Sequence, residues 1–141
     1  MLRKQTNASD PKDWFAFGAE RLAAADLLHK HHGVTATGIE TLQESVERFL
    51  KGYLIARGWA LVKTHDLPRL LREAAEHEPK FAKYRSFAAE LTEDFFAQHY
   101  PGEDTTHVGE NYEDLRAQAG ELIDLIRSGL PHYFSNQDPA A

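Results

Sequence analysis

The sequence predicts an all-α protein, an up-and-down antiparallel bundle of four long helices with one short connecting helix. Three observations lead to this prediction. In five segments apolar residues recur at intervals of three and four, which is the period of an amphipathic helix. No segment alternates apolar and polar residues with the period of a strand. Short loops rich in Gly, Pro and Asp separate the segments, and such loops join antiparallel neighbours.

The first long helix is expected over residues 11–31. Asp10 followed by Pro11 gives an N-cap and then a proline at the first helical position, where its missing N–H costs nothing. Gly33 is expected to end the helix. Three histidines, His29, His31 and His32, lie in its last turn, where positive groups favour the helix dipole. No carboxylate follows at ligand spacing, so we predict no metal site.

The second long helix is expected from residue 37 or 38 to residue 57, with a wide apolar stripe. Glu47 and Lys51 lie four residues apart in the order that favours an ion pair. Gly58 is expected to end this helix in the left-handed conformation. Three glutamates, namely Glu40, Glu44 and Glu47, are predicted to form a solvated face of this helix.

The remaining helices are one short and two long. Asp66 is predicted to be a structural N-cap for the short connecting helix, which ends before Pro79. The fourth helix is expected over residues 79–98 and the fifth over residues 111–130. We expect one domain over residues 10–134, with flexible tails at residues 1–9 and 135–141.

Composition narrows the function classes. The chain has 141 residues, of which 42% are hydrophobic and 27% charged, as in an ordinary globular domain. It has no cysteine, which excludes disulfides and thiolate chemistry and suits the cytoplasm. No apolar run is long enough for a membrane span. The net charge of −6 argues against duplex DNA as a partner, because duplex binding needs a basic face.

Residues 41–58 read TLQESVERFLKGYLIARG, and residues 63–67 read KTHDL. The first stretch resembles the second helix of the HEPN family, which carries a Q-x-x-x-E-K-x-L-K-x-x-L type of pattern before a glycine turn. The second stretch resembles the Lys-Thr-His-Asp-Leu type of element that follows this turn in the family. Downstream, His99-Tyr100-Pro101 replaces the Arg-Tyr-Pro of many members. The resemblance covers residues 13–126, nearly the whole expected domain.

The resemblance implies a helical bundle that pairs as a homodimer. Some family members act with a minimal nucleotidyltransferase encoded beside them, as in toxin–antitoxin modules. Others are ribonucleases that use an Arg-x(4–6)-His motif, and others bind nucleotides without cleaving RNA. A family resemblance therefore predicts the fold more firmly than the activity.

Two pairs in the chain match the ribonuclease motif. They are Arg72 with His77 and Arg127 with His132. Metal-independent RNA cleavage needs a base for the 2′-hydroxyl and a cation for the phosphate, which such a pair would supply. Chance alone predicts about 1.5 matches in a sequence of this composition. Only the second pair lies where the family carries its motif, so Arg127 and His132 are the catalytic candidates.

A nucleotide site is the other candidate. Its residues lie at one end of the second helix and in the loop after it, namely Lys51, Arg57, Lys63 and His65. We therefore predict a homodimer that binds a nucleotide or single-stranded RNA without a cofactor, and a non-catalytic role is favoured. The alternatives are a metal-independent endoribonuclease and a structural module that docks a partner chain.

Overall fold

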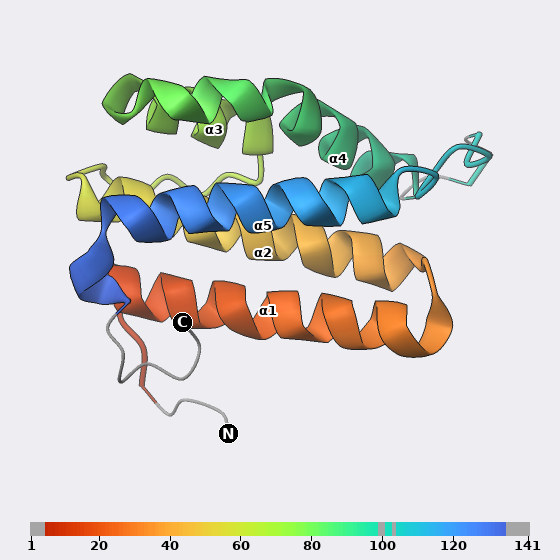
Figure 1. Cartoon of the computed structure of the whole chain (residues 1–141), viewed down its shortest axis with the longest axis horizontal. Coiled ribbons are helices and arrows are strands. Elements are labelled where there is room, and N and C mark those ends of the chain that lie inside the picture. Colours follow the sequence, from red (N-terminus) through yellow and green to blue (C-terminus); the bar gives the residue numbers. More distant parts are fainter. Residues whose placement is uncertain (1–4, 99–100, 103, 135–141) are drawn as a thin grey trace.

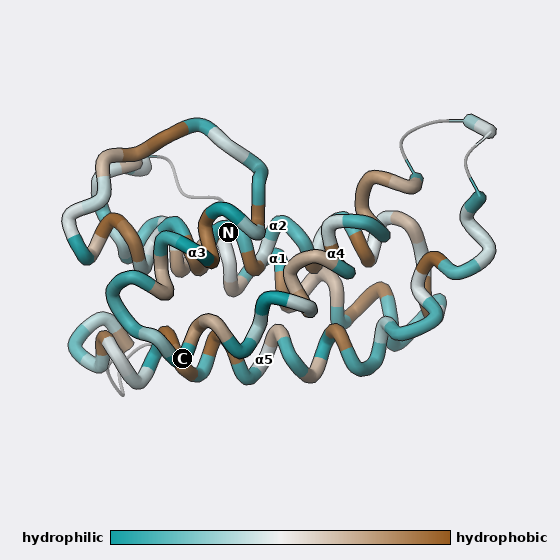
Figure 2. The backbone as a smooth tube through the Cα atoms, turned by 90° about the horizontal axis from the view of Figure 1, so that it is seen from above, coloured by the Kyte–Doolittle hydropathy of each residue, from teal (hydrophilic) through white to brown (hydrophobic). Residues whose placement is uncertain are grey.

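The computed structural model describes residues 5–98, 101–102 and 104–134, and these fold into a helical bundle. The helices are α1 (Pro11–His32), α2 (Ala36–Ala56), α3 (Leu67–His77), α4 (Arg85–Ala97) and α5 (Tyr112–Gly129), with two 3₁₀ segments, η1 (Pro79–Tyr84) and η2 (Pro131–Tyr133). The described residues contain helices and loops only, so the all-α prediction is confirmed. Figure 2 shows apolar residues recurring along the helices between polar ones.

Helix α2 is the centre of the bundle. It packs against α1, α3, α4 and α5. In Figure 1, α1 forms one edge of the bundle and α3 and α4 form the opposite edge, with α2 and α5 between them. The core consists mainly of Leu, Ile and Phe side chains from all five helices, among which Phe49, Leu50 and Leu91 are fully buried. This burial is the main stabilising term of the fold.

The predicted helix ends are present in the structure. Asp10 caps α1, because its side chain accepts a hydrogen bond from the backbone N–H of Lys12. Gly58 has a φ of 91°, in the left-handed region. Around it, the N–H of Gly58 donates to the carbonyl of Ile55 and the N–H of Trp59 to that of Leu54, which are the two bonds of a Schellman motif.

One helix prediction needs correction. The segment expected to be a single α-helix over residues 79–98 begins as the 3₁₀ segment η1 and becomes α-helical only at Arg85. Residues three apart eclipse one another in a 3₁₀ turn. The rings of Phe81 and Tyr84 are both buried as a result. Pro79 opens this segment, and the carboxylate of Glu78 accepts from the N–H of Lys80 at 3.0 Å.

The expected tails fall partly outside the described residues. Residues 1–4 and 135–141, together with His99 and Tyr100, lie outside them. Asn7 and Ala8, which the sequence assigned to the flexible N-terminal tail, are hydrogen-bonded to the start of α1. The N–H of Asn7 donates to Asp13 at 2.8 Å, and the indole N–H of Trp14 donates to the carbonyl of Ala8 at 2.8 Å.

The loop between α2 and α3 runs back along α2. It leaves α2 at its end, yet the carbonyl of His65 lies 3.5 Å from Gln43 Nε2, near the middle of that helix. Helix α3 therefore starts beside the middle of α2. It ends at His77, whose ring lies 6.5 Å from that of Tyr53. Helix α3 thus runs parallel to α2, and the four long helices alternate in direction as predicted (Figure 1).

Candidate functional site

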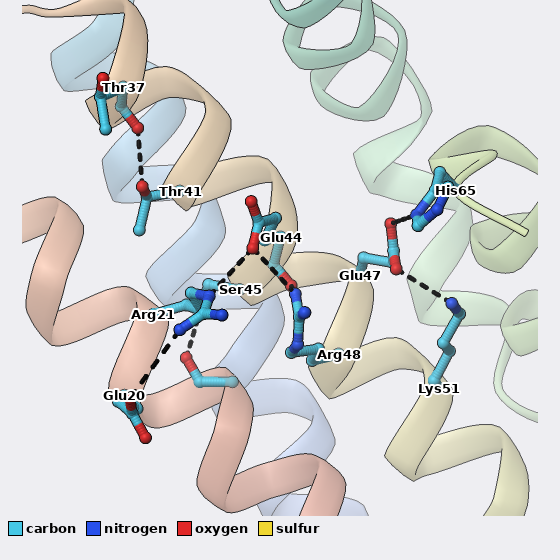
Figure 3. A network of polar contacts seen from close by, with 11 residues as sticks. Glu20, Arg21, Thr37, Thr41, Glu44, Ser45, Glu47, Arg48, Lys51 and His65 are labelled. Atoms are coloured by element: carbon cyan, nitrogen blue, oxygen red, sulfur yellow. Dashed lines mark hydrogen bonds and ion pairs between the residues drawn. The ribbon is translucent and has the colours of Figure 1, made fainter.

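A charged network lies on α2 inside the bundle. Glu47 Oε2 is 2.9 Å from Lys51 Nζ, and Glu47 Oε1 is 2.9 Å from His65 Nδ1. Figure 3 shows the Glu47 carboxylate between these two partners. The side chains of Glu47 and Lys51 are each only 5% exposed, whereas that of His65 is 82% exposed. The network therefore connects the interior of the bundle with its surface.

Both buried charges have the partners that burial demands. An unpaired ion inside a protein costs several kcal/mol, so buried charges are paired and hydrogen-bonded. Lys51 also lies over the ring of Trp14, with Nζ 5.5 Å from its centroid. The aromatic ring covers the ammonium group from the α1 side. The prediction that Glu47 belongs to a solvated face is therefore wrong, because α1 and the returning loop enclose that part of α2.

Local hydrogen bonds where the returning loop meets α3 fix the position of His65. Asp66 is the N-cap of α3, as predicted, and its Oδ1 accepts from the N–H of Arg69 at 3.1 Å. Thr64 Oγ1 accepts from the N–H of Asp66 at 3.1 Å. These two local bonds fix the backbone on either side of Asp66, because Thr and Asp side chains satisfy the free N–H groups of a helix start. His65 thereby faces α2.

A second network on α2 joins it to α1. Arg21 Nε donates to Glu44 Oε2 at 2.9 Å, and Arg48 Nη1 approaches the same oxygen at 3.3 Å. Deeper inside, Ser45 Oγ donates to the carbonyl of Gly18 at 2.8 Å (Figure 3). Of the three glutamates predicted to be solvated, only Glu40 is exposed. The spacing of four from Lys51 predicted the ion pair of Glu47 and gave no sign of its burial.

Several cations and aromatic rings gather where α2 and α5 end. Arg57 Nη2 lies 3.4 Å from the carbonyl of Gly129 and over the ring of Tyr53. Arg127 lies over the ring of Phe134 at 5.6 Å. Segment η2 continues directly from α5, and the rings of His132 and Tyr133 are 4.2 Å apart. We call Arg57, Arg127, His132, Tyr133 and Phe134 the bundle-end cluster.

The structure divides the four predicted nucleotide-binding residues. Lys51 and His65 meet at Glu47, as described above. Arg57 lies instead beside Gly129, in the bundle-end cluster that also contains Arg127 and His132. Lys63 is exposed on the returning loop. Arg57, from the nucleotide prediction, therefore lies beside Gly129, which stands between Arg127 and His132 in the chain. The sequence alone did not indicate this.

Arg72 and His77, the other Arg–His match, have different surroundings. His77 ends α3 against the ring of Tyr53. Arg72 is exposed and lines a separate groove with Arg85. Among the described residues, no group of three His, Asp or Glu side chains is arranged to hold a metal ion.

Asp94 fastens the loop before α5 to α4. Its Oδ2 accepts from the N–H of Gly109 at 3.1 Å. Burial raises the pKa of Asp94, and the hydrogen bond from Gly109 opposes this increase. Near the same loop the carboxylate of Asp104 accepts from the N–H and the hydroxyl of Thr106, and these bonds lower the pKa of Asp104.

The fold and its central polar network define a class of protein, a helical bundle built around one buried helix with paired charges. The family model described as HEPN domain matches residues 11–129, and the chain belongs to this family. The matched region runs from the first residue of α1 to the last residue of α5. No curated protein and no solved structure gives a significant match. In the part of the chain that the structure describes, no helix has the length and apolar composition needed to cross a membrane.

Proposed function

We propose that this HEPN domain binds single-stranded RNA, or the phosphates of a nucleotide, at the bundle-end cluster. The observation that supports this most directly is the approach of Arg57 Nη2 to the carbonyl of Gly129, at 3.4 Å. It joins the ends of α2 and α5 and places Arg57 beside the segment that carries Arg127 and His132. Arginine is suited to phosphate recognition because its planar guanidinium offers several donors.

Aromatic rings beside these cations support a single-stranded ligand. Tyr133 and Phe134 are both half-buried, and they follow His132 directly in the chain. Proteins that bind single strands combine cations that track the backbone with rings on which bases stack. A net charge of −6 disfavours long-range attraction of a duplex but leaves room for such a local site.

Binding of a short fluorescent single-stranded RNA, followed by anisotropy at several salt concentrations, tests this proposal. We expect Arg57→Gln to weaken binding about tenfold, because it removes one phosphate contact. Lys30→Gln is the matched control, since Lys30 is exposed at the far end of α1 and should leave the affinity unchanged. Equal binding by the wild-type protein and Arg57→Gln would contradict the proposal, as would no binding at millimolar ligand.

Cleavage by Arg127 and His132 is the second candidate. Its support is local: the N–H of Leu130 donates to the carbonyl of Arg127, and the N–H of Tyr133 donates to that of Leu130. These two successive turns keep the segment between the pair compact. Arg127→Ala and His132→Ala should each abolish RNA cleavage if this candidate is correct. Cleavage or growth toxicity that survives both changes would exclude it.

We also propose that the chain acts as a homodimer and that a minimal nucleotidyltransferase is its partner, as in other HEPN modules. The family membership supports both statements. Sedimentation should show a species of twice 16.0 kDa. A protein that remains monomeric at high concentration would count against the dimer. Co-purification with the product of a neighbouring nucleotidyltransferase gene tests the partner.

A further inference from the structure

A groove with a volume of about 430 Å³ lies between α2 and α4. From α2 it is lined by Gln43, Glu44 and Glu47, and from α4 by Phe95 and Phe96. His65 lines it from the returning loop. In Figure 3, Glu47 and His65 point toward each other from α2 and the returning loop, and Glu44 points toward Arg21 and Arg48. The groove shares no residue with the bundle-end cluster, so the proposed function makes no use of it.

A buried acceptor lines the groove. Gln43 is 2% exposed, and its Oε1 has no hydrogen-bond partner among the described residues. Its Nε2 lies 3.5 Å from the carbonyl of His65, which is a long hydrogen bond. Buried side-chain oxygens nearly always accept a hydrogen bond, so Gln43 Oε1 is an acceptor that a donor entering from the groove would satisfy.

The charges at the groove disfavour an anion. Arg48 is engaged by Glu44, to which its Nη1 lies at 3.3 Å. Lys51, behind Glu47, is engaged by that carboxylate. Glu40 also lines the groove and is exposed, and its carboxylate makes no hydrogen bond or ion pair with another described residue. The groove therefore offers a carboxylate and an amide oxygen, and its cations are already paired.

The α4 side of the groove is aromatic. The rings of Phe95 and Phe96 lie 5.3 Å apart at an angle of 81°, and Phe96 is 52% exposed. A ring face attracts a cation, and an aromatic pair offers contact area to an apolar body. Such a wall opposite a few convergent polar groups is typical of a small-molecule site.

We propose that this groove binds a small organic cation of the amine or amidine class. One of its N–H groups donates to Gln43 Oε1, its charge is balanced by Glu40, and its apolar body packs against Phe96. A ligand of this groove therefore needs both a positive charge and an N–H donor. These requirements differ from those of a phosphate ligand at the bundle-end cluster.

Three related probes separate these requirements. Benzylamine has a ring, a positive charge and N–H donors, benzyltrimethylammonium has the ring and the charge alone, and benzyl alcohol is neutral. We expect benzylamine to bind at millimolar concentration or below and to shift the NMR signals of Phe96 and of the Gln43 side-chain amide. Benzyltrimethylammonium should bind about tenfold more weakly, because it cannot donate to Gln43, and benzyl alcohol more weakly still.

Variants assign the binding to these residues. Gln43→Met keeps the length of the side chain and removes the buried acceptor, so it should fold with no loss of melting temperature and bind benzylamine about tenfold more weakly. Glu40→Gln should weaken benzylamine binding and leave the benzyl alcohol result unchanged. Glu93→Gln is the matched control, because Glu93 is exposed on α4 and does not line the groove.

Phe96→Ala keeps the test decisive if Gln43→Met does not fold. Phe96 is largely exposed, so its truncation should leave the bundle intact and weaken benzylamine binding.

The proposal is overturned if no probe binds at roughly 10 mM, if all three bind equally, or if Gln43→Met or Phe96→Ala binds benzylamine as the wild type does. It is also overturned if Phe96→Ala dissociates a dimer while benzylamine has no effect, because the groove is then a protein interface. RNA binding at the bundle end should be unchanged in every one of these variants.

Discussion

Two ion pairs in this bundle are similarly short and have very different surroundings. Glu47 and Lys51 meet at 2.9 Å inside the bundle, both 5% exposed. Asp26 on α1 and Arg116 on α5 meet at 2.6 Å and 3.0 Å through two hydrogen bonds, with side chains 47% and 31% exposed. The outer pair has the better geometry, and the Asp26 carboxylate raises the pKa of Arg116.

The comparison teaches that burial, more than distance, decides what an ion pair means for the fold. Water and salt screen an exposed pair, so its removal costs little. A buried pair contributes little net stability as a pair, but either member left alone is a desolvated charge. The inner pair is therefore a condition for burying α2, whereas the outer pair only adds to the contact between α1 and α5.

The largest expected effect comes from breaking the inner pair on one side. Lys51→Met leaves Glu47 with His65 as its remaining partner, and we expect a loss of about 3 kcal/mol in the free energy of unfolding. Chemical denaturation measures this loss. The double variant Glu47→Met/Lys51→Met should recover most of it, because no charge is then buried. A single variant as stable as the wild type would show that water reaches this part of α2.

The packing of α1 over the inner pair can be tested by a substitution at Gly52. A Cβ atom at Gly52 would lie 2.6 Å from the ring of Phe15 and 3.1 Å from Cβ of Trp14, the residue that covers Lys51. Gly52→Ala should therefore push α1 away from α2 and lower stability by about 2 kcal/mol, as overpacking of a core does. Thermal unfolding measures it. Gly120→Ala is the control, since its Cβ would meet only the end of the Arg116 side chain.

The outer pair should give a smaller effect. Arg116→Gln removes the ion pair with Asp26 at a site that solvent reaches, and we expect a loss of about 0.5 kcal/mol. The difference from the wild type should shrink as salt is added, because exposed charges are screened. A loss as large as that of Lys51→Met, independent of salt, would contradict the distinction between the two pairs.

Asp94 extends the comparison to an acid whose side chain accepts a hydrogen bond from a backbone N–H, that of Gly109. Its raised pKa means that the folded state holds the proton more tightly than the unfolded state. Stability from this group is therefore greatest at low pH and is lost as the pH rises through the folded pKa. Asp94→Asn, which mimics the protonated form and can still accept from Gly109, should raise the melting temperature slightly at pH 7. This gain should disappear below the ordinary pKa of 3.8.

The helices could be predicted from the sequence because their signals are local. Asp10, Gly58 and Asp66 each act within a few residues of their own position, so the caps follow from the sequence alone. The 3₁₀ form of η1 was missed, since Pro79 reads equally well as the start of an α-helix. Burial of Glu47 was missed for another reason: it depends on a loop that returns over α2, and no local pattern encodes that path.

The candidate sites could be predicted only in part. The sequence singles out Lys51, His65, Arg57 and the pair Arg127 and His132 one by one, as candidates. Which of them lie together depends on where helices end in space. The unpartnered amide oxygen of Gln43 could not be predicted, because a buried amide without a partner becomes visible only when the atoms around it are known.

The contact between Phe15 and Phe134, whose ring centroids are 4.6 Å apart, brings the two ends of the described chain together. The start of α1 and the end of the described chain thus lie side by side. Phe134 is also a member of the bundle-end cluster. A tag or fusion partner at the C-terminus extends the chain beyond Phe134, which packs against Arg127. RNA-binding measurements that test the proposed site are therefore best made on untagged protein or on circular permutants opened elsewhere.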